Sequence, residues 1–266
     1  MFLKHSDKKP WLILIHGLGV SENIWSKPDK EKMKFISFKT LLKEEKEIIS
    51  FVARCGDRYN IASWSQDPFG SINEAAEELK DLVNNIGGPD FIFIAHSRGG
   101  LVARLAIQRH GLKPGALICL ATPHYGSNLA NCVMKYMPLI RLLAPNVVQN
   151  RASINELRTD STLIQEINMP ENYEYEKNVP HFDLCGHSPK YFNWGPLNII
   201  GSAKFFFGNR VIDEWKEGAG DGFVSVQSAR SPLTPEKYCY LLPVNHANIL
   251  INVKVFNIVS DILKQY

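Results

Sequence analysis

The apolar run Phe91–Ala95 is followed within two residues by Ser97 and then directly by a helical pattern. Such a continuous apolar run is typical of a strand buried on both faces of a parallel sheet. The residues after Ser97 have the apolar spacing of a helix face that packs on that sheet, at Leu101, Val102, Leu105 and Ala106. The segment therefore predicts a strand that turns sharply into a helix at Ser97.

The same alternation recurs along the chain. Four other short apolar runs predict strands at Trp11–Ile15, Ala116–Ala121, His181–Cys185 and Tyr238–Leu242. Amphipathic helices are expected at 71–86, where Ser71 and Glu74 have the spacing of a capping box, and from about Asn248 to Lys264. Strands that alternate with helices predict the α/β class, with a doubly wound and mostly parallel sheet.

Two stretches interrupt this alternation. Residues 126–179 carry helix-like and loop-like pieces and are too many for a plain connection, so we expect a helical cap inserted over the sheet. A smaller insertion is expected at 191–218. With 266 residues, the chain is interpreted as a single domain, 1–266, that contains both insertions.

Composition narrows the class of protein. Hydrophobic residues are 45% and charged residues 21%, as in an ordinary globular domain. The net charge of +3 is too small to indicate a nucleic-acid partner.

The five cysteines are widely spaced, without a C-x-x-C pair, and are expected to be free thiols. The chain shows neither a secretory signal nor a membrane-spanning run, so a cytoplasmic protein without stable membrane insertion is expected.

The expected turn at Ser97 has the features of a nucleophile elbow. In such a turn the serine has strained backbone angles, and the residues two positions before and after it must be small because strand and helix approach closely. Ala95 and Gly99 occupy those positions. A serine hydroxyl is a weak nucleophile, so it requires a base that is itself held by a carboxylate, both in later loops.

Among the eight histidines, His246 alone follows both Ser97 and the last predicted strand and precedes the final helix, as the general base should. Asp221 is the best candidate for the acid because glycines flank it and would let its carboxylate approach an imidazole. Asp213 is the fallback, and Asp183 and Glu214 compete less well. His96 and His124 are further candidates for lining the site.

Attack on a carbonyl creates an oxyanion that needs preorganised donors. The loop His16-Gly17-Leu18-Gly19 follows the first predicted strand, and its glycines allow a backbone N–H to turn into the site. Leu18 and Arg98, through their N–H groups, are the predicted oxyanion donors. The Arg98 side chain is expected to be either a surface group or a substrate contact, and His16 to orient the loop.

These motifs resemble bacterial lipases and carboxylesterases of the α/β-hydrolase superfamily. The similarity covers the oxyanion loop at 16–19, the elbow at 95–99, the segment 122–127 that enters the cap, the cap helix at 157–168 and the loops around Asp221 and His246. Ala95 and Ser225 depart from the usual glycine and proline. The resemblance implies a triad of Ser97, Asp221 and His246 that forms an acyl-enzyme on carboxylic esters.

The leading interpretation is thus a carboxylesterase or lipase that needs no cofactor and acts on a small-molecule or lipid ester, with transient lipid contact as an option. An acyltransferase, thioesterase or amidase would use the same triad, and a non-catalytic interaction module is disfavoured. Trp25, Tyr125 and Trp194 are candidate acyl-pocket residues, and Phe205–Phe207 a candidate lid. Some lipases of this kind bind calcium or zinc, but the sequence shows no compact histidine and carboxylate cluster, so no metal site is predicted.

Overall fold

The computed structural model describes residues 2–4, 9–33, 36–37, 50–67, 69–87, 90–143, 152–189 and 212–266. A seven-stranded sheet runs through its centre in the order β1-β5-β2-β6-β7-β8-β9. The strands are β1 (Phe2–Lys4), β2 (Trp11–Ile15), β5 (Asn60–Ser63), β6 (Phe91–His96), β7 (Leu117–Leu120), β8 (His181–Gly186) and β9 (Cys239–Leu242). β1 pairs antiparallel with β5, and the pairs from β5 to β9 are parallel.

The α/β class and the mostly parallel sheet are confirmed, because the five predicted apolar runs coincide with β2 and β6–β9 to within one or two residues at each end. β1 and β5 were not predicted. A two-stranded sheet of β3 (Lys32–Met33) and β4 (Ile36–Ser37) lies outside the main sheet.

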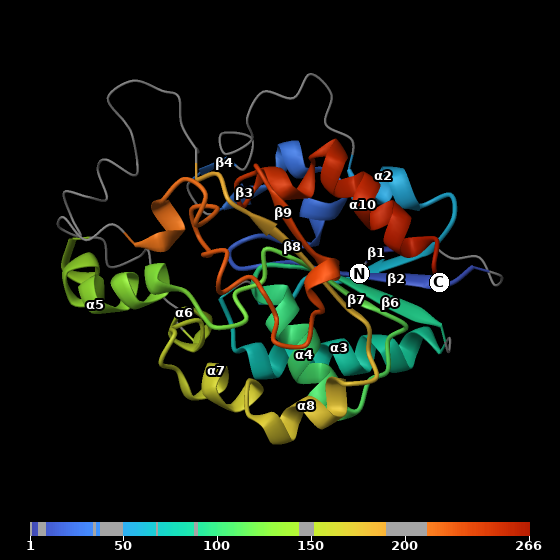
Figure 1. Cartoon of the computed structure of the whole chain (residues 1–266), viewed down its shortest axis with the longest axis horizontal. Helices are drawn as coiled ribbons and strands as arrows, with labels where there is room; N and C mark the ends of the chain where they lie inside the picture. The colour runs from blue at the N-terminus through green and yellow to red at the C-terminus, as the bar shows by residue number, and fades with distance from the viewer. Residues whose placement is uncertain are drawn as a thin grey trace.

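Helices cover both faces of the sheet, which explains why its strands are apolar throughout (Figure 1). On one face, alternate strand residues such as Ile13 and Phe93 pack against α3 (Ile72–Ile86) and α4 (Arg98–His110). On the other face, Leu12 and Ile94 pack with α2 (Phe51–Cys55) and α10 (Val253–Leu263). These two apolar layers fix the strand that carries Ser97 between them.

Two helix starts differ from their predictions. Ser71 caps α3, but its Oγ accepts from the N–H of Asn73 rather than Glu74, and the N–H of Ile72 donates to Glu156 Oε2 (2.7 Å). A carboxylate from a distant segment thus contributes to the cap of this helix. The last helix begins at Val253 with Asn252 as its cap, because residues 248–250 form a separate 3₁₀ turn.

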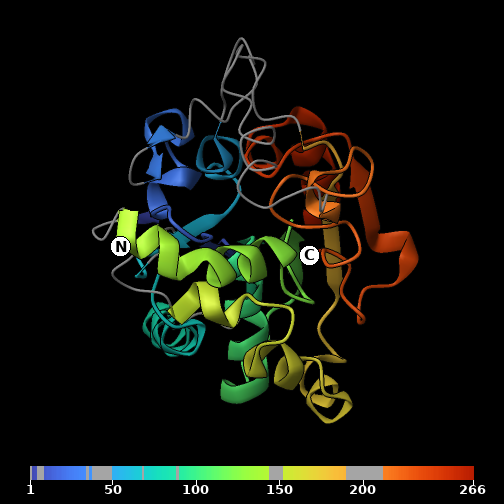
Figure 2. The same ribbon diagram turned by 90° about the vertical axis from the view of Figure 1, so that its left-hand side faces the viewer.

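The predicted cap stretch contains α5 (Asn128–Leu143), α6 (Ala152–Glu156), α7 (Thr162–Ile167) and α8 (Pro170–Glu176). α7 and α8 lie beside α4 on its face of the sheet, whereas α5 and α6 lie at the end of the molecule that holds the site (Figures 1 and 2). Most of the predicted insertion at 191–218 lies outside the described residues. Within the described part of the chain, no helix combines the length and hydrophobicity needed to cross a membrane.

A fully buried ion pair joins α8 to α4. Arg104 Nε lies 3.0 Å from Glu176 Oε2, and both side chains have no exposed surface. Arg104 also donates to the carbonyl of Ile167 (2.9 Å) and to Asn168 Oδ1 (3.0 Å), and Gln108 donates to the same Ile167 carbonyl (2.9 Å). The helix that follows Ser97 is therefore anchored by polar contacts as well as by its apolar face.

Acidification is expected to destabilise the protein through His181. Burial lowers the pKa of His181 to about 4, although the nearby carboxylates of Glu176 and Asp183 oppose that shift; Arg104 and His124 add to it. The unfolded chain therefore binds a proton between pH 6.5 and 4 that the folded chain does not, so stability falls as the pH falls through this window. We expect His181 to lower the free energy of unfolding by about 2 kcal/mol between pH 7 and pH 5.

The measurement is urea unfolding of the wild type and of His181→Gln at pH 7 and pH 5. The variant should lose about 2 kcal/mol less than the wild type over this interval. Equal losses in the two proteins would assign the acid sensitivity to other groups.

Candidate active site

Ser97 sits at a strained turn between β6 and α4. Its φ of 54° and ψ of −127° lie outside the regions that residues with a side chain ordinarily adopt. The N–H of Ser97 donates to the carbonyl of Leu120 in β7 (2.9 Å), which holds the strained residue in place. A Cβ on Gly99 would stand 2.5 Å from the carbonyl oxygen of Ile15, so glycine is required there as the motif predicted.

Asp221 and His246 form a hydrogen-bonded pair. His246 Nδ1 lies 2.7 Å from Asp221 Oδ2, and the N–H of His246 donates to the backbone carbonyl of Asp221 (3.1 Å). Asp221 Oδ1 accepts from the N–H groups of Phe223 (2.9 Å) and Val224 (2.8 Å), so the carboxylate is held on both oxygens. His246 and Ser97 line the same cavity.

The competing acids are engaged elsewhere. Asp213 is exposed and pairs with Lys216 (2.6 Å). Glu214 is buried, accepts from the N–H of Asn128 at the start of α5 (2.7 Å), and has its pKa raised by that burial. Among the four candidates, the structure brings only Asp221 to His246.

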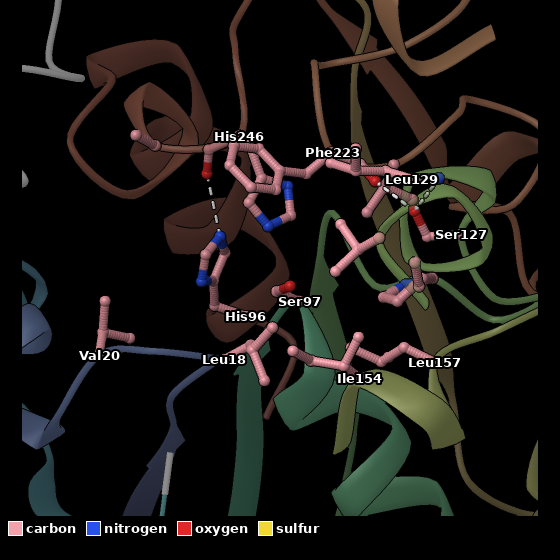
Figure 3. A pocket seen from close by; sticks show the side chains of 15 residues that line it. Leu18, Val20, His96, Ser97, Ser127, Leu129, Ile154, Leu157, Phe223 and His246 are labelled. Carbon is pink, nitrogen blue, oxygen red and sulfur yellow. Dashed lines mark hydrogen bonds between the residues drawn. The ribbon is translucent and has the colours of Figure 1, made fainter. Parts of the chain in front are cut away.

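A second imidazole, that of His96, contacts the backbone of His246. Its Nε2 lies 3.0 Å from the backbone carbonyl oxygen of His246, and the two rings are 4.7 Å apart (Figure 3). Burial, and to a lesser extent the neighbouring His246, lower the pKa of His96 well below its usual value. A neutral ring that donates through Nε2–H satisfies that carbonyl. His96 lines the cavity, as its position beside the serine had suggested.

The loop after β2 is held against Ser97 by buried polar contacts. A Cβ on Gly17 would stand 2.9 Å from the Cβ of Ser97. His16 is fully buried, its pKa is lowered to about 4 by burial, and its Nε2 faces the N–H of Gln66 (3.4 Å). Gln66 Nε2 in turn donates to the carbonyl of His16 (3.1 Å), and Leu18 faces the cavity.

The expectation for the Arg98 side chain is wrong. Its guanidinium is fully buried and donates to Gln66 Oε1 (2.6 Å) and to the carbonyls of Gly70 (2.9 Å) and Ser71 (3.2 Å). The Arg98 side chain is therefore neither a surface group nor a substrate contact. These three acceptors satisfy a guanidinium that would be costly to bury without hydrogen bonds. Gln66, which sequence reasoning missed, connects this side chain to the loop after β2.

A mostly apolar cavity of about 150 Å³ opens above the serine. Figure 3 shows the side chains of Ser97, His96 and His246 at this cavity, with Leu18 and Ile154 on the opposite side of Ser97 from His246. The remaining wall is built mainly by α5, α6 and the segment after Asp221, through Leu129, Ala130, Val133, Leu157, Phe223 and Val224. The arrangement can hold an apolar group beside a serine, an imidazole and a carboxylate.

The predicted pocket aromatics do not line this cavity among the described residues. Trp25 is a core residue, 1% exposed, whose ring packs edge-on against Phe51 at 5.4 Å, so its assignment to the pocket is wrong. Tyr125 is 41% exposed and lines a separate polar hollow. Trp194 and Phe205–Phe207 lie outside the described residues.

Distant residues form a compact polar cluster that the sequence did not reveal. Cys119, His124 and Asp183 are buried, with their potential ligand atoms within 4.8 Å of one another. His124 Nε2 lies 3.1 Å from Asp183 Oδ1, and the N–H of Ser231 donates to Asp183 Oδ2 (2.7 Å). Burial raises the pKa of the Cys119 thiol well above its usual value. Hydrogen bonds already occupy both carboxylate oxygens, so we interpret the cluster as structural; His124 contributes to it rather than to the cavity.

The fold and the site define a hydrolase of the α/β-hydrolase class. A sequence profile of the palmitoyl protein thioesterase family matches residues 12–182, and the chain belongs to this family. No curated protein matches its sequence.

Solved structures support the same class. Mature lipase BlEst2 of Bacillus licheniformis is similar with a TM-score of 0.63 at 21% identity, over 98% of this chain and 97% of the lipase. The metagenomic carboxyl esterase MGS0156 gives a TM-score of 0.60 at 12% identity, over 98% of this chain and 77% of the esterase. At these identities the likeness establishes the fold.

Proposed function

We propose that the chain is a serine hydrolase that cleaves carboxylic esters through an acyl-enzyme on Ser97. The observation that carries this proposal is the pairing of His246 with Asp221 at 2.7 Å beside a cavity that also exposes the strained Ser97. The apolar wall of this cavity favours the acyl group as the part of the substrate that binds in it.

In this mechanism His246 removes the hydroxyl proton as Ser97 attacks the acyl carbonyl, and Asp221 stabilises the imidazolium. The N–H groups of Arg98 and Leu18 stabilise the oxyanion. Arg98 directly follows Ser97, and Gly17 lets the loop that carries Leu18 approach Ser97 closely. His246 then gives the proton to the leaving alcohol. His246 next removes a proton from water as the water attacks the acyl-enzyme. It then returns the proton to Ser97 as the carboxylic acid is released.

Thioester cleavage is the second candidate, favoured by the family to which residues 12–182 belong. The chemistry at Ser97 is unchanged, but the leaving group is a thiol, which departs more easily than an alcohol and relies less on protonation by His246. Comparing an oxygen ester with a thioester of the same acyl chain separates the two substrates.

Labelling with a fluorophosphonate probe tests the proposal. We expect stoichiometric labelling of the wild type at Ser97 and none in Ser97→Ala. Hydrolysis of p-nitrophenyl and thiol esters of rising acyl length then identifies the substrate class. Labelling that persists in Ser97→Ala would assign the nucleophile to another residue.

The apolar wall of the cavity is expected to contact the acyl chain. A cavity of about 150 Å³ is matched by a ligand of about six carbon atoms. Val133 lines its wall from α5 and is half-buried, so Val133→Phe would fill part of the space while the rest of the ring faces solvent. The ratio of kcat/KM for the hexanoyl over the acetyl ester should fall about tenfold.

Val133→Ala is the matched control, since it enlarges the same wall and should preserve or raise that ratio. An equal loss on both esters in Val133→Phe would show that the acyl chain does not occupy this cavity.

A further inference from the structure

Two cysteines that are 54 residues apart in the sequence come together on neighbouring strands. In the parallel pairing of β8 with β9, Asp183 is opposite Cys239 and Cys185 is opposite Leu241. The sulfur atoms of Cys185 and Cys239 lie 3.9 Å apart. The sequence predicted five free thiols without a redox pair, because this proximity depends on the strand register and not on a local motif.

The surroundings make the two sulfur atoms different. Arg230 Nε donates to Cys239 Sγ (3.2 Å), and this contact places a positive charge beside the sulfur. The hydrogen bond with Cys185, together with the one from Arg230, lowers the pKa of Cys239 to about 6 against the effect of partial burial. Cys185 is fully buried, and its Sγ lies 3.3 Å from the carbonyl oxygen of Ala229. The structure thus favours a thiolate at Cys239 and a protonated thiol at Cys185.

Solvent reaches the pair from the side of Cys239. This residue is half-buried and lines a surface hollow of about 210 Å³ together with Arg230, Ser231 and Thr234. Cys185 is buried and does not line that hollow. A small oxidant therefore meets Cys239 first.

We propose that Cys239 and Cys185 form a peroxide-reactive thiol pair, separate from the hydrolase site, in which Cys239 is oxidised first and Cys185 resolves it. The Cys239 thiolate attacks one oxygen of hydrogen peroxide, the O–O bond breaks, and the released hydroxide is protonated to water. Cys185 Sγ then attacks the Cys239 sulfenic acid, the S–O bond breaks, and the Cys185 proton leaves with that oxygen as a second water. Two thiols and one peroxide become one disulfide and two waters.

Alkylation by iodoacetamide at pH 6.5 tests the reactivity of Cys239. Cys132 is the internal control, because it is also half-buried and its burial raises its pKa. We expect Cys239 to be alkylated at least roughly tenfold faster than Cys132, since the thiolate is the reactive form. Arg230→Gln should slow only Cys239. Arg158→Gln, which removes an exposed arginine that pairs with Asp160, should change neither rate.

Peroxide treatment tests the resolving step by peptide mass spectrometry. The wild type should lose two of its five free thiols and yield one cross-linked peptide that contains both Cys185 and Cys239. Cys185→Ala should stop at a sulfenic acid on Cys239 that dimedone traps, and Cys239→Ser should keep Cys185 reduced. Melting temperatures verify that each variant is folded.

Equal alkylation of Cys132 and Cys239 would overturn the proposal. So would oxidation of wild-type Cys239 that leaves Cys185 as a free thiol.

Discussion

Replacing Ser97 with alanine is expected to lower kcat about a millionfold while leaving the fold intact. Alanine keeps a Cβ at a residue whose φ is 54°, so the strained turn and the N–H donated to Leu120 are preserved. The loss is large because every step of the proposed reaction passes through the hydroxyl oxygen; related triads lose about 10⁶-fold in kcat. Ester hydrolysis rates and melting temperatures of the two proteins are the measurement.

The three residues of the proposed triad should act as one unit. Combining Ser97→Ala with His246→Ala is expected to cost no more than either change alone, because the base has no function without its nucleophile. A loss in the double variant equal to the product of the single losses would contradict the mechanism.

The same assay distinguishes the acid from its neighbours. Asp221→Asn keeps the shape of the carboxylate but removes the charge that stabilises the imidazolium, so kcat should fall about 10⁴-fold. Asp213→Asn is the matched control, because Asp213 is exposed and pairs with Lys216, and its kcat should stay within about twofold of the wild type. A larger loss from Asp213→Asn would reassign the acid.

The parts that the sequence predicted well are those whose information is local. Each of these signals lies within a few residues of the structure that it predicts. They are a continuous apolar strand, small residues on either side of Ser97, and glycines around Asp221. These signals indicated the strained turn at Ser97 and the two loops whose Asp221 and His246 the fold brings together.

β5 was missed because its burial is not local. Asn60–Ser63 has two polar residues among four, so it shows no apolar run. Both polar side chains are satisfied by other segments: Asn60 donates to the carbonyl of Lys9 (2.7 Å), and Ser63 donates to that of Leu14 (2.8 Å). Nothing within the four residues indicates those partners.

Buried charge was missed for the same reason. The Arg98 side chain was expected at the surface or in contact with substrate, and no prediction was made for Arg104, yet both are completely buried. Four of their acceptors, Gln66, Gly70, Ser71 and Glu176, lie 27 to 72 residues away in the sequence. Only the assembled fold places these groups together, and it does so along α4, the helix that follows Ser97.

Breaking the buried pair of Arg104 and Glu176 should therefore be the most destabilising of the polar changes considered for this protein. Glu176→Gln removes the charge that faces the guanidinium at 3.0 Å and leaves an uncompensated cation where neither side chain reaches solvent. Such a change typically costs about 3–5 kcal/mol. Urea unfolding curves of the wild type and the variant give the difference.

The exposed pair between the same two layers is the matched control. Arg109 of α4 contacts Glu166 of α7 at 2.6 Å, but both side chains are more than a third exposed. Solvent screens this pair, so Glu166→Gln should cost less than about 1 kcal/mol. Equally small losses of unfolding free energy in Glu176→Gln and Glu166→Gln would show that burial does not make the first pair more important for stability.

Replacing both members of the buried pair separates the cost of an unpaired charge from the value of the pair. The double variant Arg104→Met with Glu176→Leu should be more stable than Glu176→Gln, because no charge then remains buried without its partner. Recovery to the wild-type level is not expected, since the Ile167 carbonyl and Asn168 Oδ1 lose donors that Arg104 supplies. The order of the three unfolding free energies thus tests whether Arg104 anchors α4 through its charge, through these two hydrogen bonds, or through both.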